Sequence, residues 1–86
     1  MPRMIVTHEV DDVAHWLSSP KRTEVFGGVA TDIVTFVDLT NPTQVGLGMN
    51  VQDLAAFQAI MESAAGADAM KHDGVHQDTL ASFVEP

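Results

Sequence analysis

The chain contains no cysteine and no tyrosine, and only four of its 86 residues are lysine or arginine. The lack of cysteine excludes a disulfide framework and thiolate chemistry. Twelve acidic residues outnumber the four basic ones, which gives a formal net charge of −8. Because nucleic acids and anionic membranes are recognised by clustered basic side chains, we expect neither as a partner.

Long apolar runs are also missing. No stretch approaches the roughly 18 residues that a membrane-spanning helix needs, and the residues before the first strand-like run are too few for a secretory signal. We therefore expect a cytoplasmic protein with a single domain over residues 1–86. Apolar residues nevertheless make up 45% of the chain, which favours a second burial surface, most simply in a homodimer.

The order of the patterns is the most informative feature that is present: strand, helix, strand, hairpin, strand, helix, strand. β-rich runs at 31–38 and 45–51 flank a loop that contains Asn41 and Pro42, as in a hairpin. The first strand is expected over 4–10 and the last over 78–84. In the first strand, Met4, Val6, His8 and Val10 share one face.

The helices are predicted from apolar spacing and capping residues. Asp11 or Asp12 can cap a first helix that carries Trp16, and a short turn runs from Pro20 towards Gly27. Asn50 or Asp53 opens the second helix, which Gly66 weakens in its middle. One further turn over 67–71 is expected before residues 72–74 end the helix.

This order resembles the dimeric α+β barrel superfamily, which includes antibiotic-biosynthesis-monooxygenase-like proteins and small polyketide cyclases. The resemblance covers nearly the whole chain. It rests on Val10 and Asp11 with Trp16, on Gly28 and Val29, on Asn41 and Pro42, and on Ala69 and Met70 followed by Gly74 and Val75.

The resemblance implies an α+β, ferredoxin-like βαββαβ fold with an antiparallel sheet in the order 4-1-3-2. It also implies that two sheets pack face to face in a homodimer and that a ligand lies between the sheet and the helices of each subunit. Function varies widely within this superfamily, so the fold does not settle it.

The histidines are the candidate catalytic groups. If the last strand pairs antiparallel with the first, His76 comes near His8, and His72 ends the second helix at the same edge. We therefore expect these three residues to converge near Trp16. His8 and His76 are the better candidates for a general base, because a helix C-terminus favours the charged form of His72. Each of the three could instead be a structural or solvated residue.

A pocket for an apolar or aromatic ligand is expected beside these histidines. Alternating glycines, Gly46 and Gly48, could leave space for the ligand or could pack against a large side chain. The ligand-pocket residues expected from the sequence are Trp16, Phe26, Phe36, Phe57, Met61, Gly46, Gly48 and His72. The basic pair Lys21 and Arg22 is interpreted as a solvated turn.

Three functions stay open. The first is a small-molecule-binding protein or cofactor-independent enzyme of the monooxygenase/cyclase-like group. The second is a non-catalytic homodimeric interaction module. The third is a metal or haem binder through His8, His72 and His76; because zinc needs several ligands with firm geometry, we predict no metal site and no organic cofactor.

Overall fold

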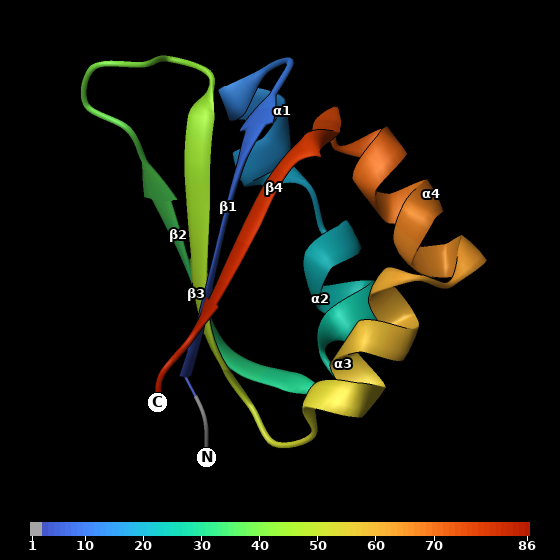
Figure 1. Cartoon of the computed structure of the whole chain (residues 1–86). Helices are drawn as coiled ribbons and strands as arrows, with labels where there is room; N and C mark the ends of the chain where they lie inside the picture. Colours follow the sequence, from blue (N-terminus) through green and yellow to red (C-terminus); the bar gives the residue numbers. More distant parts are fainter. Residues whose placement is uncertain (1–2) are drawn as a thin grey trace.

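The computed structural model describes residues 3–86 and contains one four-stranded antiparallel sheet with the order β2-β3-β1-β4. This is the predicted order 4-1-3-2 read from the opposite edge. All four helices cover the same face of the sheet (Figure 1), so the α+β, ferredoxin-like arrangement is confirmed. The elements are β1 (Arg3–Val10), α1 (Val13–Ser18), α2 (Lys21–Phe26), β2 (Ala30–Val37), β3 (Gln44–Val51), α3 (Leu54–Met61), α4 (Ala64–His72) and β4 (Val75–Val84).

Each expected helical region contains a break, and the breaks follow from capping. Asp12 accepts a hydrogen bond from the His15 backbone N–H and opens α1, and Asp53 does the same for α3 through the Ala56 N–H. Ser63 accepts from the Gly66 N–H and opens α4 as a separate helix. The expectation of one helix weakened at Gly66 is therefore wrong: the break lies at residues 62–63, and Gly66 lies inside α4.

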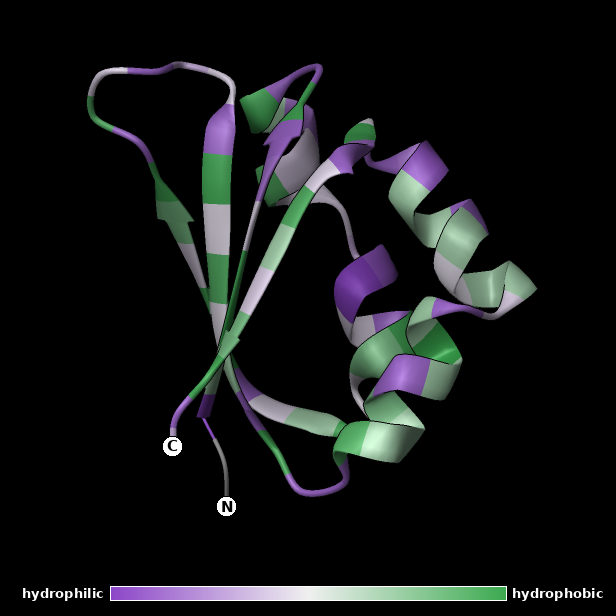
Figure 2. Ribbon diagram, in the orientation of Figure 1, coloured by the Kyte–Doolittle hydropathy of each residue, from purple (hydrophilic) through white to green (hydrophobic). Residues whose placement is uncertain are grey.

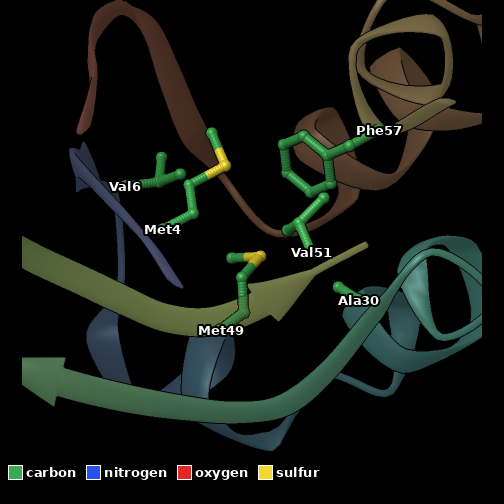
Figure 3. Packing of buried hydrophobic residues seen from close by; sticks show 6 residues of the cluster. All are labelled: Met4, Val6, Ala30, Met49, Val51 and Phe57. Atoms are coloured by element: carbon green, nitrogen blue, oxygen red, sulfur yellow. The ribbon is translucent and has the colours of Figure 1, made fainter. Parts of the chain in front are cut away.

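The main core lies between the sheet and the helices. The inward faces of β1 and β3 meet Phe57 of α3, and Figure 3 shows these side chains directed into the space between the two layers. The buried cluster comprises Met4, Val6, Ala30, Met49, Val51 and Phe57. A second cluster of Val10, Trp16 and Val45 lies under α1. The predicted alternation of β1 is thus confirmed, with Met4, Val6, His8 and Val10 all buried.

The other face of the sheet has no covering element in the part of the chain that the structure describes (Figure 1). Directly paired residues on antiparallel strands share a face, and the pairs of Ile5 with Gly48 and Phe83 and of Phe36 with Gly46 define this outer face. Ile5, Phe36 and Phe83 are each more than half exposed. Figure 2 shows hydrophobic and paler segments alternating along the strands. The sheet nevertheless carries apolar side chains on both faces, because these three residues lie opposite the buried core.

Both edge strands are irregular. In β2 the pairing shifts between Thr31 and Val34, where Asp32 adopts a left-handed φ of 53° and accepts a hydrogen bond from the Asn50 side chain. The pairing of β1 with β4 shifts between Thr7 and Glu9. There the Glu9 backbone N–H donates to the Thr79 hydroxyl, which in turn donates to the His76 carbonyl. β4 begins three residues earlier than the sequence predicts.

No helix within residues 3–86 is long and apolar enough to cross a bilayer.

Candidate functional site

A cavity of about 50 Å³ lies between the sheet and the helices. This volume exceeds the roughly 10–15 Å³ that one water molecule needs, but a larger ligand would have to displace side chains. Most of the wall is apolar, and three lining residues carry a titratable group: His8, Arg22 and Asp73. The full lining is Val6, His8, Trp16, Arg22, Phe26, Ile33, Leu47, Met49, Phe57, Met61, Ala69, Met70, Asp73, Val75 and Leu80.

His8 is the buried imidazole of this cavity. It lies on the inward face of β1 with 3% of its surface exposed, and its ring meets the Trp16 ring edge-on at 5.7 Å between centroids. Its Nδ1 atom is buried and has no hydrogen-bond partner among the described residues. Burial is the largest cause that lowers the pKa of His8 from its ordinary value of 6.5, and the charges of Arg22 and His76 lower this pKa further. The Glu9 backbone and the charge of Asp73 raise it, which offsets the lowering only in part. The neutral imidazole is therefore favoured.

Arg22 closes one side of the cavity over Trp16. Its guanidinium lies 4.6 Å from the centroid of the Trp16 ring, and Nη1 donates to the Trp16 carbonyl at 2.8 Å. Burial lowers the pKa of Arg22, while the charge of Asp73 acts in the opposite direction. The interpretation of Arg22 as part of a solvated turn is therefore wrong, because α2 directs this side chain against Trp16.

Asp73 brings a carboxylate to the same cavity from the end of α4. Its side chain is only 5% exposed, and Oδ1 accepts a hydrogen bond from Nδ1 of His72 at 3.0 Å. Gly74 follows with a φ of +72°, which turns the chain sharply into β4. A buried carboxylate needs compensating charge, and Arg22 and His72 are the neighbouring cationic or titratable groups.

The structure divides the residues expected in the pocket into two sets. Trp16, Phe26, Phe57 and Met61 line the cavity together with His8. Phe36, Gly46 and Gly48 do not, because they lie on the outer face of the sheet. A Cβ atom on Gly48 would meet the Phe36 ring at 3.2 Å. Of the two interpretations of these glycines, packing against a large side chain is the one that the structure bears out.

The expected convergence of the three histidines is wrong. His76 pairs with Glu9 across β1 and β4, and since neighbouring residues in a strand point to opposite faces, it lies on the other side of the sheet from His8. His76 is exposed, and its Nε2 makes a 2.5 Å contact with Oδ1 of Asp11. His72 is also exposed, outside the cavity, and only its neighbour Asp73 reaches the lining.

Three residues of this region were missed from the sequence: Arg22, Asp73 and His15. Nε2 of His15 lies 2.8 Å from the His72 carbonyl, so α1 and the end of α4 are in direct contact. A signal for Asp73 was present in its position just before the helix-ending Gly74. Arg22 and His15 gave none, because their neighbours come from segments whose packing the sequence pattern does not fix.

No family model and no curated protein matches the chain. Among solved structures, an antibiotic biosynthesis monooxygenase aligns with a TM-score of 0.64 and 15% identity, over 100% of this chain and 97% of its own. The chain has the fold of the antibiotic biosynthesis monooxygenases.

Two further solved structures share this fold. SnoaB from Streptomyces nogalater, a cofactor-independent oxygenase, aligns with a TM-score of 0.62 and 11% identity over 98% of this chain and 87% of its own. A DABB family protein with a ferredoxin-like fold from Mesorhizobium loti aligns with a TM-score of 0.62 and 10% identity, covering 99% and 94%. The resemblance stated from the sequence is therefore confirmed for the fold.

Proposed function

We propose that the chain binds an apolar or aromatic small molecule in the cavity between sheet and helices, with His8 as the group that accepts a proton from it. The observation that carries this proposal is the buried, unpartnered Nδ1 of His8 at the wall of an apolar cavity. Buried polar atoms normally have a partner, and one left without it beside a cavity is suited to a ligand that donates a hydrogen bond.

The environment of His8 suits a general base. Desolvation favours the neutral ring, which has a lone pair ready to accept a proton. The Trp16 ring packs edge-on against the His8 ring. Asp73 and Arg22 place a negative and a positive charge in the same cavity, where they can stabilise the charges that a proton transfer creates. His76 lies on the opposite face of the sheet, so the base is assigned to His8 alone.

The likeness to a cofactor-independent oxygenase supports a reaction that needs no organic cofactor. The cavity volume of about 50 Å³ limits what enters without rearrangement. Flexible side chains such as Met61 and Met70 line the wall and can move aside. The proposed ligand is accordingly flat, apolar and equipped with one acidic O–H or C–H group.

The binding step can be tested with a matched pair of probes, 2-naphthol and 2-methylnaphthalene, followed by NMR of backbone amides. We expect both to shift residues around the cavity, and 2-naphthol to bind about 3- to 10-fold more tightly because its hydroxyl can donate to His8. The variant His8→Leu should lose this preference. His76→Ala, an exposed histidine outside the cavity, is the control and should keep it. Shifts confined to the outer face of the sheet would contradict the proposal.

The base can be tested with 2-tetralone, an aromatic ketone with exchangeable α-protons, in deuterated water. We expect the protein to accelerate exchange and His8→Leu to lose most of the effect, since a general base contributes about 10²- to 10⁴-fold. If 2-naphthol binds as described but exchange is not accelerated, the chain is a binding protein without this catalytic step.

We also propose that two copies associate through the outer face of the sheet. Ile5 pairs there with Phe83 and with Gly48, and the Phe36 ring lies over Gly48; the three apolar side chains are each more than half exposed. Contiguous apolar patches on a protein surface mark interaction sites. Because this face is opposite to the cavity, the association leaves the ligand site of each copy open. If the chain has no catalytic activity, this association would give it a role as a non-catalytic homodimeric interaction module.

A further inference from the structure

We propose that His15, His72 and Asp73 form a binding site for a divalent transition-metal ion of the Zn²⁺ type. One ligand atom from each of the three residues lies within 4.8 Å of the others. This group differs from the His8, His72 and His76 set expected from the sequence, and it does not depend on the proposed function. It joins α1 to the end of α4, two elements separated by more than forty residues.

The three side chains already lie against one another. Nε2 of His15 faces the His72 carbonyl at 2.8 Å, and Nδ1 of His72 faces Oδ1 of Asp73 at 3.0 Å. Because ligands bind a metal ion in their deprotonated form, an ion bound to His72 and Asp73 would replace the proton between these two atoms. His15 would add one ring nitrogen from α1.

The distances require only small side-chain movements. The ring centroids of His15 and His72 lie 5.2 Å apart with an angle of 40° between the planes. Ligands at about 2.0–2.1 Å from a tetrahedral zinc ion lie roughly 3.4 Å from one another. The side chain of His72 is 46% exposed and His15 is exposed as well. Rotation of these rings can therefore close the gap, and the ion has free access from solvent.

Asp73 supplies the negative charge. Its carboxylate is 5% exposed, and Oδ1 lies beside Nδ1 of His72, so an ion between these two atoms would contact both. Two imidazoles and one carboxylate favour Zn²⁺, Ni²⁺ or Cu²⁺ over Ca²⁺ and Mg²⁺, which prefer all-oxygen sites. Three protein ligands would leave a fourth position for water. The net charge of −8 further favours a cation.

An ion bound at this site would lie outside the cavity but would restrain two residues that line it. Asp73 is both a member of the metal group and a lining residue, and Trp16, which follows His15 in α1, also lines the cavity. An ion that joins α1 to α4 would therefore fix the separation of these two lining residues. Because an ion that binds only the folded chain stabilises it, Zn²⁺ should also raise the unfolding temperature.

The test is a calorimetric titration of the full chain with Zn²⁺. We expect one ion per chain, and an affinity at least about 10-fold lower in His15→Ala and in His72→Ala. The control is His76→Ala, because the His76 side chain is exposed to a similar extent (43%) but contacts Asp11 and lies outside the group. Its affinity should equal that of the original chain. Equal binding by His15→Ala and the original chain would overturn the proposal, as would the absence of saturable binding.

A second measurement needs no substitution, so it decides the question even if a variant fails to fold. The ¹⁵N resonances of the four imidazoles can be followed while Zn²⁺ is added. We expect large shifts for His15 and His72 and little change for His8 and His76. Shifts of similar size in His76 would show adventitious binding to exposed histidines and would overturn the site.

Discussion

At the scale of single residues, the two faces of the sheet impose opposite environments on two histidines that are close in the strand pairing. His8 is buried among apolar groups, and burial lowers its pKa. His76 is exposed and faces a carboxylate, and the hydrogen bond that its Nε2 donates to Asp11 raises the pKa of His76, with the charges of Asp11, Glu9 and Asp78 adding to it. The alternation of β1 and β4 thus separates a neutral imidazole from one that is readily charged.

The first prediction concerns the titration of His76. In the folded chain, NMR should give His76 a pKa above 6.5 and His8 a pKa below 6.5. The variant Asp11→Asn should move the pKa of His76 down towards 6.5 and leave that of His8 nearly unchanged. A raised pKa means that the charged form of His76 is stabilised by folding. Its contribution to stability is therefore complete below pH 6.5 and is lost as the pH rises through the folded pKa.

The opposite sign applies to His8. Folding favours the neutral form of His8. Its contribution to stability is therefore present above pH 6.5 and declines as the pH falls below that value, because His8 then becomes protonated in the unfolded chain. The variant His8→Leu should therefore weaken the loss of stability on mild acidification. A pKa of His8 above that of His76 would contradict the placement of the two residues.

At the scale of elements, the junction of α3 and α4 depends on a residue without a side chain. Gly66 lies in the first turn of α4, and a Cβ atom there would meet the Ile60 carbonyl oxygen at 2.1 Å. This close approach lets the chain turn at Ser63, whose hydroxyl donates to the same Ile60 carbonyl at 2.6 Å and accepts from the Gly66 N–H.

The second prediction follows from this junction. Replacing a helical glycine by alanine ordinarily adds about 1 kcal/mol of stability. Gly66→Ala should instead lower the free energy of unfolding by about 2 kcal/mol, because the backbone must move to admit the methyl group. Urea denaturation measures the difference. Ala67→Gly, at an exposed position in the same helix, is the control and should cost about 1 kcal/mol. A stabilised Gly66→Ala variant would show that the junction is not tight.

The elements themselves were largely predictable, because local chemistry specifies them. The relevant features are the β-rich runs, the acidic caps Asp12 and Asp53, and the loop at Asn41 and Pro42. Each of them acts only on the few residues next to it in the sequence. The break at Ser63 was not predicted, since the sequence indicated one helix weakened at Gly66, and a serine inside an apolar helical pattern does not by itself signal a cap. The early start of β4 depends on pairing with β1, a contact between the two ends of the chain that no local pattern records.

The candidate site was predictable only in part for the same reason. His8, Trp16 and Phe57 each lie on the face of their own strand or helix that the apolar periodicity assigns to the interior. Phe36 has the same apolar character, yet its strand pairing places it on the outer face. Arg22 and Asp73 came into the site through the packing of α2 and α4 on the sheet. Such packing brings together residues that are distant in sequence, and the spacing of residue types along the chain does not predict it.

At the scale of the whole molecule, the sheet separates two surfaces with different proposed tasks. The helical side encloses the cavity, and the outer side exposes Ile5, Phe36 and Phe83. The third prediction tests the outer side by sedimentation. We expect the chain to sediment with twice its mass of 9.2 kDa, and Phe36→Asp to shift it to the single-chain mass, because a charge in an apolar interface is costly to bury.

The control for this experiment lies on the helical side. Leu54 of α3 is also a partly exposed apolar residue, at 40%. Leu54→Asp should leave the association unchanged. If the original chain sediments at the single-chain mass over the whole concentration range, the outer face does not join two copies. An equal effect of both substitutions would indicate unfolding or another contact surface, and circular dichroism of the two variants distinguishes these results.

The irregular edges of the sheet have a consequence for how far such assembly can proceed. The extra residues at Asp32 and near Thr79 fall in β2 and β4, the two strands that have a neighbour on one side only. A regular edge offers a template to which another chain can add, copy after copy. Here the pairing of each border strand is irregular, which disfavours the addition of further strands at either border.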